Sequence, residues 1–409
     1  MSNKNKKKKK GSWVKKRHRA VVWLLNLFLT PIVRIKYHVK IERFKEIKNR
    51  QFFVISNHQT GFDQFFTSIA CYPTHLYYFA SEDLFSKGFV SRLIKFLVNP
   101  IPFMKSTSDV SAILNCKRIV KEGGSIGLFP EGNRTYDGKL GYVKPTVASL
   151  VKALKLPLAI FRIEGGYGIH PRWSDVTRKG KMRAYVSRVV EPEEYSKMTD
   201  DELFELIINE MNVDDTVIDG EFKHKKNAEF LERALYLCPE CGLSRFESHK
   251  DTFTCKNCGL SVRHLPTKEL EAIKGNLPFK TVSEWYQYQN NYISTLDLSK
   301  YFDTAAYLEE ARFTEVIPNK KQNLIAKNAS VALFGNKVVI KYKNNEQVFD
   351  FNNVHAMTVL GKNKLDIYIS DKIYQLKGDK RFNAVKFVNF FYRFSSVYKE
   401  VKNGRALGL

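Results

Sequence analysis

The sequence predicts an α/β fold for the first half of the chain, because short apolar runs alternate there with helical segments. The apolar runs are rich in β-branched and aromatic residues, which is typical of buried strands, and they lie at 52–55, 125–129 and 156–161. The segments that read as helices lie at 63–70, 111–121 and 147–154. This alternation is typical of a sheet covered by helices.

A histidine and an aspartate follow the first of these strands. His58 and Asp63 are five residues apart, and in a regular helix such positions point about 140° away from each other. The two side chains can therefore meet only if His58 lies on the strand-to-helix turn, where Gly61 supplies a permissive backbone. Open α/β sheets place their chemistry at such turns, and a carboxylate fixes the tautomer of a histidine that acts as general base.

Two motifs together resemble a known family. Asn57-His58-x4-Asp63 resembles the His-x4-Asp motif of the glycerolipid acyltransferases, the lysophosphatidic acid acyltransferase family. About seventy residues further on, Phe129-Pro130-Glu131-Gly132-Asn133-Arg134 resembles that family's Phe-Pro-Glu-Gly-Thr-Arg motif. The resemblance covers roughly residues 20–215. It implies a mixed sheet flanked by helices, with the acyltransferase domain at 46–215.

The resemblance also implies a reaction and its residues. An acyl group would move from acyl-CoA or acyl carrier protein to the hydroxyl of a lysophospholipid, most simply 1-acyl-glycerol-3-phosphate, giving phosphatidic acid. His58 would be the general base, and Asp63 would orient it. The leaving thiol has a pKa of about 8.5 and departs readily. The acceptor oxygen can therefore attack the thioester directly, and no covalent acyl-enzyme is required.

Substrate-binding residues follow from the same resemblance. Arg134 matches the residue that binds the substrate phosphate, and its planar fork suits that group. Glu131 and Gly132 would fix the loop. Lys105 matches a basic residue of the family's second block at 101–106, and the run 156–161 matches the block that lines the acyl pocket. Asn133 stands where the family usually has threonine, which leaves the acceptor headgroup open.

The charge of the chain points to a polyanionic partner. The net charge is +25, from 67 basic and 42 acidic residues, and the basic excess is not confined to the lysine-rich stretch at 4–19. An anionic membrane surface and a nucleic acid would both suit this charge. A length of 409 residues favours two or three domains.

The apolar run at 20–29 decides between these partners. With its flanks it is about fourteen residues long, short of the roughly 20 that a spanning helix needs. Pro31 and Arg34 stand where a signal peptide would have its cleavage site. We therefore expect residues 1–45 to form a basic tail and a membrane-interfacial helix. This helix would hold the protein, as a peripheral or monotopic one, on the cytoplasmic face of the cell membrane.

For the amphipathic segment 84–98 we expect an ordinary core-facing helix, and a further membrane contact is the alternative.

Four cysteines form two knuckles, Cys238-x2-Cys241 and Cys255-x2-Cys258, with zinc-ribbon spacing. Four thiolates complete a closed tetrahedral site, so the zinc at 228–264 would be structural and independent of catalysis. An iron site of the rubredoxin kind is the alternative. No redox cofactor is expected.

The remainder, 280–409, reads as an α+β domain. Residues 281–292 read as a helix, 303–315 as helical or irregular, and short alternating strands follow beyond 328. A helix at 381–398 closes the chain. The order and length resemble a pleckstrin-homology-like barrel, and a small generic α+β scaffold fits equally.

Two competing interpretations remain to be weighed. A nucleic-acid-binding zinc-ribbon protein would suit the charge and the ribbon, but the apolar run at 20–29 has no use on nucleic acid, so no nucleic-acid partner is expected. The run 123–127 matches the G-x-S-x-G elbow of hydrolases. That elbow needs a strand before its serine and a helix after it. Here the order is reversed, so Ser125 is expected to be a turn residue.

Overall fold

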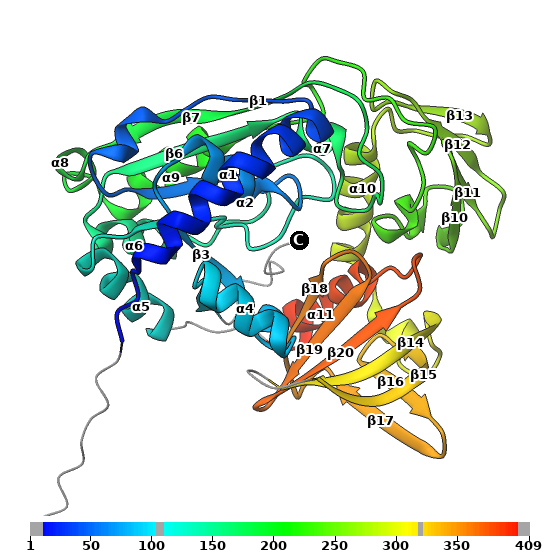
Figure 1. The fold of residues 1–409 in the computed structure, drawn as a ribbon. Helices are drawn as coiled ribbons and strands as arrows, with labels where there is room; N and C mark the ends of the chain where they lie inside the picture. Colours follow the sequence, from blue (N-terminus) through cyan, green and yellow to red (C-terminus); the bar gives the residue numbers. More distant parts are fainter. Residues whose placement is uncertain (1–10, 104–109, 318–321, 400–409) are drawn as a thin grey trace, which may run out of the picture.

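The computed structural model of the chain describes residues 11–103, 110–317 and 322–399. Figure 1 shows an α/β part, a small antiparallel sheet beside it, and a larger, curled antiparallel sheet. Helix α10 (Val282–Thr295) lies between the α/β part and the two antiparallel sheets (Figure 1).

The α/β part is built on a mixed sheet, as predicted. In the described part of the chain its seven strands have the order β1-β7-β6-β2-β5-β3-β4. The pair β6–β7 is antiparallel and the other pairs are parallel. The strands are β1 (Val39–Ile41), β2 (Phe53–Ser56), β3 (Leu76–Ser81), β4 (Ile101–Phe103), β5 (Ser125–Leu128), β6 (Leu158–Glu164) and β7 (Met182–Val190).

Both faces of this sheet are covered by helices. In β2, Phe53 and Ile55 pack in one apolar cluster and Val54 in another, as the alternation of side chains along a strand requires. The first cluster includes helices α5, α6 and α9, and the second includes α1 and α2. These and the short helices of this part are α1 (Lys16–Tyr37), η1 (Lys45–Lys48), α2 (Asp63–Ala70), α5 (Val110–Lys121), α6 (Thr146–Leu154), α7 (Gly166–Ile169), α8 (Pro192–Tyr195) and α9 (Asp200–Met211).

The hydrolase-like run has the reversed order that was predicted. Helix α5 precedes Ser125 and strand β5 begins at it. The Ser125 hydroxyl is buried and accepts a hydrogen bond from the Phe52 backbone N–H at 3.1 Å. Ser125 is therefore a structural residue, but it is the first residue of β5 and not the turn residue that was expected.

The N-terminal helix is longer than the apolar run predicted. Helix α1 spans 22 residues and continues through Pro31. It is long and apolar enough to cross a membrane by length and composition. Both of its ends nevertheless pack on the α/β part, because the His18 Nδ1 lies 2.9 Å from the Tyr77 hydroxyl and Tyr37 is fully buried. The helix therefore lies along the protein surface between these two residues.

The expectation of a core-facing helix at 84–98 is wrong. The segment forms α3 (Glu82–Phe85) and α4 (Phe89–Leu97), which are separated at Gly88, a residue with positive φ. In α4 the apolar residues Phe89, Leu93 and Phe96 are exposed, whereas Ser91 is buried. An amphipathic pattern gives the same period whether its apolar face meets a core or a lipid surface, so the sequence could not separate the two.

The cysteine-containing part forms two small sheets after a short helix, η2 (Leu231–Arg233). Strands β8 (Leu237–Cys238) and β9 (Gly242–Leu243) form one sheet, and β10 (Phe246–His249), β11 (Thr252–Cys255), β12 (Ser261–His264) and β13 (Leu270–Lys274) form the other.

The last part is a curled antiparallel sheet that precedes a helix. Its order within the described residues is β17-β16-β15-β14-β20-β19-β18. The elements are η3 (Leu298–Tyr301), β14 (Tyr307–Val316), β15 (Asn323–Leu333), β16 (Lys337–Tyr342), β17 (Asn345–Asp350), β18 (Val354–Leu360), β19 (Lys364–Ile369), β20 (Lys372–Gly378) and α11 (Val385–Tyr398). The expectation that 303–315 is helical or irregular is wrong, since most of it is strand β14. This strand pairs with both β15 and β20, and these neighbours determine its conformation.

One apolar cluster connects all three parts. It contains Phe253 of the ribbon, Trp285 of α10 and Phe391 of α11, and it reaches Tyr136 and Trp173 in the α/β part. The parts are therefore packed together through a shared core.

Candidate active site

The turn after β2 brings the predicted histidine and aspartate together. The Asn57 side chain fixes the start of this turn by two hydrogen bonds of 2.8 Å with the backbone of Ile163 in β6. His58 follows, and its Nδ1 lies 2.8 Å from Oδ2 of Asp63, the first residue of α2. Strand and helix thus hold the two side chains from opposite ends of one short turn.

Asp63 is fully buried and its carboxylate organises the whole turn. It accepts hydrogen bonds from the backbone N–H groups of Gln59 and Thr60 at 2.6 and 2.9 Å, and from the Thr60 hydroxyl at 2.6 Å. A carboxylate held by these donors remains an acceptor, so the Nδ1–H of His58 donates to it. The Nε2 of His58 is then the nitrogen that can take a proton.

The surroundings of His58 favour the neutral imidazole. Burial lowers the pKa of His58, and the positive charges of Arg134 and Arg172 lower it further, while Asp63 opposes them without reversing the shift. The ring stacks on Phe129 with the centroids 4.6 Å apart. A neutral, oriented imidazole is the form that a general base needs.

Glu131 connects the two motifs through their backbones. Its carboxylate accepts the N–H of His58 at 2.6 Å and the N–H of Gly141 at 2.7 Å. Thr135 N–H donates to the carbonyl oxygen of His58 at 3.2 Å, so the loop holds the histidine from both sides. Burial raises the pKa of Glu131 to about 8. Gly132, the next residue, has a φ of 68°, which favours glycine.

Arg134 lies close to the histidine turn. Its Nη1 would lie 3.6 Å from a Cβ placed on Gly61, so this glycine leaves room for the guanidinium. Burial lowers the pKa of Arg134 to about 10, and the nearby Arg172 adds to the effect. Among the described residues Nη1 has no hydrogen-bond partner. A buried guanidinium with an unused N–H is suited to bind an anion.

Two cavities of different character meet this site. An apolar cavity of about 680 Å³ lies between α1, α2, β3 and α4, and His58 and Phe129 are part of its lining. A polar cavity of about 270 Å³ lies between the loop that carries Arg134 and helix α10. Glu131, which bonds His58, also lines the polar cavity. His58 therefore lines the apolar cavity, and Glu131 connects its backbone to the wall of the polar cavity.

Sequence reasoning missed the residues that hold the loop 131–142 from outside the α/β part. Gln287 of α10 donates from Nε2 to Asp137 at 2.8 Å, and Tyr286 stacks on Tyr136. Arg172 donates to the carbonyl oxygen of Arg134 at 3.0 Å and to the Asn133 side chain at 3.3 Å. These partners come from distant segments and carry no local motif, so only the fold could reveal them.

The family resemblance also implied roles for Lys105 and for the segment 156–161. Lys105 lies outside the described residues. The segment 156–161 was expected to line the acyl pocket, but Ile160 and Phe161 are fully buried in the core, and the apolar cavity beside His58 is lined by other segments. β6 lies inside the sheet with helices on both of its faces, and the assignment of this segment to the acyl pocket stays a prediction.

The four ribbon cysteines converge at a second place. Their sulfur atoms lie within 4.8 Å of one another, and the Cys238–Cys258 and Cys241–Cys255 sulfurs are each 3.6 Å apart. A tetrahedral zinc with Zn–S bonds of about 2.3 Å would separate its sulfurs by about 3.8 Å. The cluster therefore fits one tetrahedral metal ion.

The α/β fold thus places a histidine–aspartate pair close to a buried arginine. The acyltransferase family model matches residues 35–164, which contain both motifs. This match supports the resemblance to the glycerolipid acyltransferases over that part of the chain and assigns the protein to the acyltransferase class of enzymes.

Curated relatives agree with this placement. The chain is 23% identical to a 1-acyl-sn-glycerol-3-phosphate acyltransferase of Bacillus subtilis over 188 residues, which cover 45% of this chain and 89% of that protein. Two chloroplast 1-acyl-sn-glycerol-3-phosphate acyltransferases, from Brassica napus and Arabidopsis thaliana, are 29% and 30% identical. Each of these matches covers 23% of this chain and 27% or 26% of the relative.

Among solved structures, the chain is similar to the crystal structure of PlsC, a 1-acyl-sn-glycerophosphate acyltransferase from Thermotoga maritima. The TM-score is 0.40 and the identity 23%, over 48% of this chain and 80% of that chain.

Proposed function

We propose that the protein transfers a fatty acyl group from an acyl thioester, acyl-CoA or acyl carrier protein, to the hydroxyl of a lysophospholipid. The acceptor we propose is 1-acyl-glycerol-3-phosphate, and the product is phosphatidic acid. The observation that supports this most strongly is that His58, with its Asp63 partner, lines an apolar cavity, while Arg134 and Glu131, which bonds His58, line a polar one. An acyl chain suits the first space and a phosphate the second.

The proposed reaction uses His58 as general base. Nε2 of His58 takes the proton of the acceptor hydroxyl, while Asp63 holds Nδ1–H and stabilises the imidazolium. The hydroxyl oxygen attacks the thioester carbonyl carbon, a C–O bond forms and the C–S bond breaks. The departing sulfur takes the proton from Nε2, so His58 returns to its neutral form.

Arg134 is proposed to bind the acceptor phosphate. Arg134→Lys keeps the charge and loses the planar fork, so the acceptor KM should rise by about tenfold to a hundredfold, which corresponds to a charge-assisted contact of about 1–3 kcal/mol. Steady-state kinetics with 1-acyl-glycerol-3-phosphate and acyl-CoA measures the effect. The control is Arg162→Lys, a half-buried arginine whose Nη2 bonds only the Asn212 carbonyl oxygen among the described residues. An unchanged acceptor KM with a raised donor KM would place Arg134 in the donor site.

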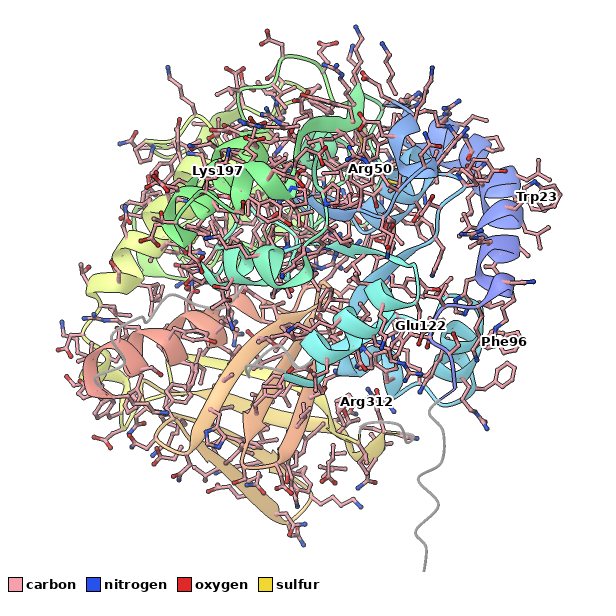
Figure 2. The ribbon with its side chains drawn as sticks, turned by 90° about the vertical axis from the view of Figure 1, so that its left-hand side faces the viewer. Trp23, Arg50, Phe96, Glu122, Lys197 and Arg312 are labelled. Atoms are coloured by element: carbon pink, nitrogen blue, oxygen red, sulfur yellow. The ribbon has the colours of Figure 1, made fainter. Side chains whose placement is uncertain are left out.

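An apolar face of the protein is proposed to dock on an anionic membrane at its cytoplasmic side. Trp23 of α1 is 54% exposed and Phe96 of α4 is 55% exposed. Figure 2 shows both side chains projecting on the same side of the molecule. The first turn of α1 carries Lys16 and Arg17, and its last turn carries Arg34 and Lys36. Because both ends of α1 pack on the α/β part, an in-plane helix fits better than one that crosses the bilayer.

Removing this apolar face should release the protein from lipid. Trp23→Ser and Phe96→Ser should each weaken binding to anionic vesicles by on the order of tenfold, since each side chain loses about 1.5 kcal/mol or more of burial. Vesicle co-sedimentation measures the binding. Leu308→Ser is the matched control, because Leu308 is 57% exposed on the C-terminal sheet. Equal losses in all three variants would refute docking through this face.

Three further assignments are part of the proposal. The four cysteines are proposed to hold one structural zinc. The chain is proposed to divide into an N-terminal tail and helix at 1–45, an acyltransferase domain at 46–215, a ribbon at 228–264 and an α+β domain at 280–409. The last domain is proposed to be pleckstrin-homology-like, because a sheet of seven antiparallel strands is followed there by a closing helix.

A further inference from the structure

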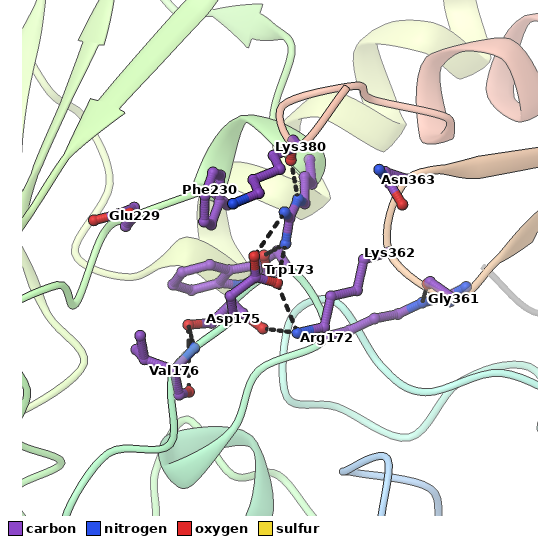
Figure 3. Close-up of polar contacts among 12 residues, drawn as sticks. Arg172, Trp173, Asp175, Val176, Glu229, Phe230, Gly361, Lys362, Asn363 and Lys380 are labelled. Atoms are coloured by element: carbon purple, nitrogen blue, oxygen red, sulfur yellow. Dashed lines mark hydrogen bonds and ion pairs between the residues drawn. The ribbon is translucent and has the colours of Figure 1, made fainter. Parts of the chain in front are cut away.

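A buried arginine connects the loop that carries Arg134 to the C-terminal sheet. Arg172 is 1% exposed, and its guanidinium forms hydrogen bonds in two directions. On one side it donates to the Arg134 carbonyl oxygen and the Asn133 side chain. On the other it donates to the carbonyl oxygens of Val359 and Gly361, at 3.0 and 3.2 Å. Figure 3 shows Arg172 directed toward Gly361, at the turn between β18 and β19.

The loop side of this connection needs such support. Gly132 is exposed and has a positive φ, and the residues from Glu131 to Tyr142 form no helix or strand. Side-chain contacts therefore fix the conformation of the loop, and Arg172 also lies over the Tyr136 ring at 4.3 Å from its centroid. Asn133, at the usual threonine position of the family motif, accepts one of the Arg172 hydrogen bonds.

The other side of the connection is itself anchored. Lys362, in the same β18–β19 turn, donates from Nζ to Asp175 at 2.9 Å. Asp175 also accepts hydrogen bonds from Arg233, the last residue of η2, and Arg233 donates to the carbonyl oxygen of Trp173 as well. The segment 172–175 is thus held between the ribbon and the C-terminal sheet. Because Arg172 belongs to this segment, its hydrogen bonds hold the loop in a fixed position relative to both parts.

The charges of Arg172 and Arg134 are a second, independent indication that Arg172 takes part in binding an anionic acceptor. Arg172 lies close enough to Arg134 that its positive charge, after burial, lowers the pKa of the Arg134 guanidinium. Two buried cations in one place are stabilised by an anion bound between or beside them. The pair therefore suits the phosphate of the acceptor better than a single arginine would.

We propose that Arg172 is a positioning residue for acceptor binding, and that the β18–β19 turn of the C-terminal sheet forms part of the acceptor site through it. This inference rests on the proposed function. The C-terminal part then contributes to the affinity for the phosphorylated acceptor and leaves the chemistry at His58 unchanged.

The test compares two buried arginines in the full-length protein. Arg172→Ala and Arg172→Lys remove the fork that spans the loop and the turn. The matched control is Arg178→Lys, because Arg178 is also 1% exposed and donates to the carbonyl oxygens of Gly168 and Asn227, neither of which lies in the loop 131–142. The acceptor KM should rise at least about tenfold in both Arg172 variants, with kcat and the donor KM within about threefold. It should rise less than about threefold in the control.

A second measurement does not depend on activity. Hydrogen exchange of the amides in residues 131–142 should be faster in Arg172→Lys than in the wild type and unchanged in Arg178→Lys. Equal effects of the two arginines on KM, or unchanged exchange in the loop, would overturn the inference. A wild-type protein that acylates no lysophospholipid, but whose loop exchange responds to Arg172, would refute the proposed function and leave the positioning role supported.

Discussion

Replacement of His58 by alanine is expected to lower the turnover of acyl transfer by at least about 10²-fold, the usual contribution of a positioned general base. We expect this loss because Asp63 holds the Nδ1 of His58 at 2.8 Å, which leaves Nε2 to take the proton, and because His58 also lines the apolar cavity. Initial rates with saturating acceptor and acyl-CoA measure the effect. The loss should appear in kcat, since neither proposed binding space loses a polar contact to substrate.

A matched variant and a pH profile sharpen this prediction. His249→Ala removes an exposed histidine of the ribbon and should leave kcat unchanged. In the wild type, burial lowers the pKa of His58 below 6.5, so the neutral base persists to lower pH. The acid limb of the kcat profile should therefore lie below pH 6.5. Near-normal turnover of His58→Ala would remove His58 from the mechanism, and an acid limb above pH 6.5 would contradict the environment described for it.

The parts of this site that could be predicted from the sequence are those set by local geometry. His58 and Asp63 lie five residues apart on one turn, and a strand followed by a helix permits few arrangements of such a pair. The arginine of the second motif follows its own strand by a similar rule. The family resemblance added what these residues do, and the comparisons bear out the class.

The parts that could not be predicted depend on contacts across long sequence separations. Arg172 meets the Gly361 carbonyl oxygen across 189 residues, and Gln287 meets Asp137 across 150. Neither partner belongs to a periodic pattern. Strand β14 took its conformation from neighbours on both of its edges, and the apolar face of α4 had the same period as a core helix.

Loss of the ribbon metal is expected to have the other large effect. Cys255→Ser removes one of four thiolate ligands and should release about one equivalent of zinc, and the region around 228–264 should unfold locally, since bound zinc supplies much of the folding free energy of so small a unit. Metal content by atomic spectroscopy and limited proteolysis measure these effects. Lys256→Ala is the matched control, because it lies in the same knuckle and removes only an exposed ion pair with Glu247.

The sequence suggested that this ribbon is independent of catalysis, and the contacts of α10 change that expectation. Trp285 Nε1 donates to the Leu237 carbonyl oxygen at 2.7 Å, and the Gln289 side chain accepts the Tyr236 N–H at 2.8 Å. These bonds attach α10 to the chain just before the first cysteine, and Gln287 of the same helix holds Asp137 in the loop beside Arg134. A ribbon that unfolds should therefore loosen α10 and, through it, the proposed acceptor site.

Cys255→Ser is thus expected to raise the acceptor KM by on the order of tenfold, as the loss of one or two hydrogen bonds of roughly 0.5–1.5 kcal/mol each would do. Zinc content and initial rate must be measured on the same sample, with hydrogen exchange of residues 131–142 alongside. Zinc loss with an unchanged acceptor KM and an unchanged loop would establish the independence that the spacing of the cysteines suggested. Zinc loss with faster exchange in the loop and a raised acceptor KM would show that the ribbon supports the site through α10.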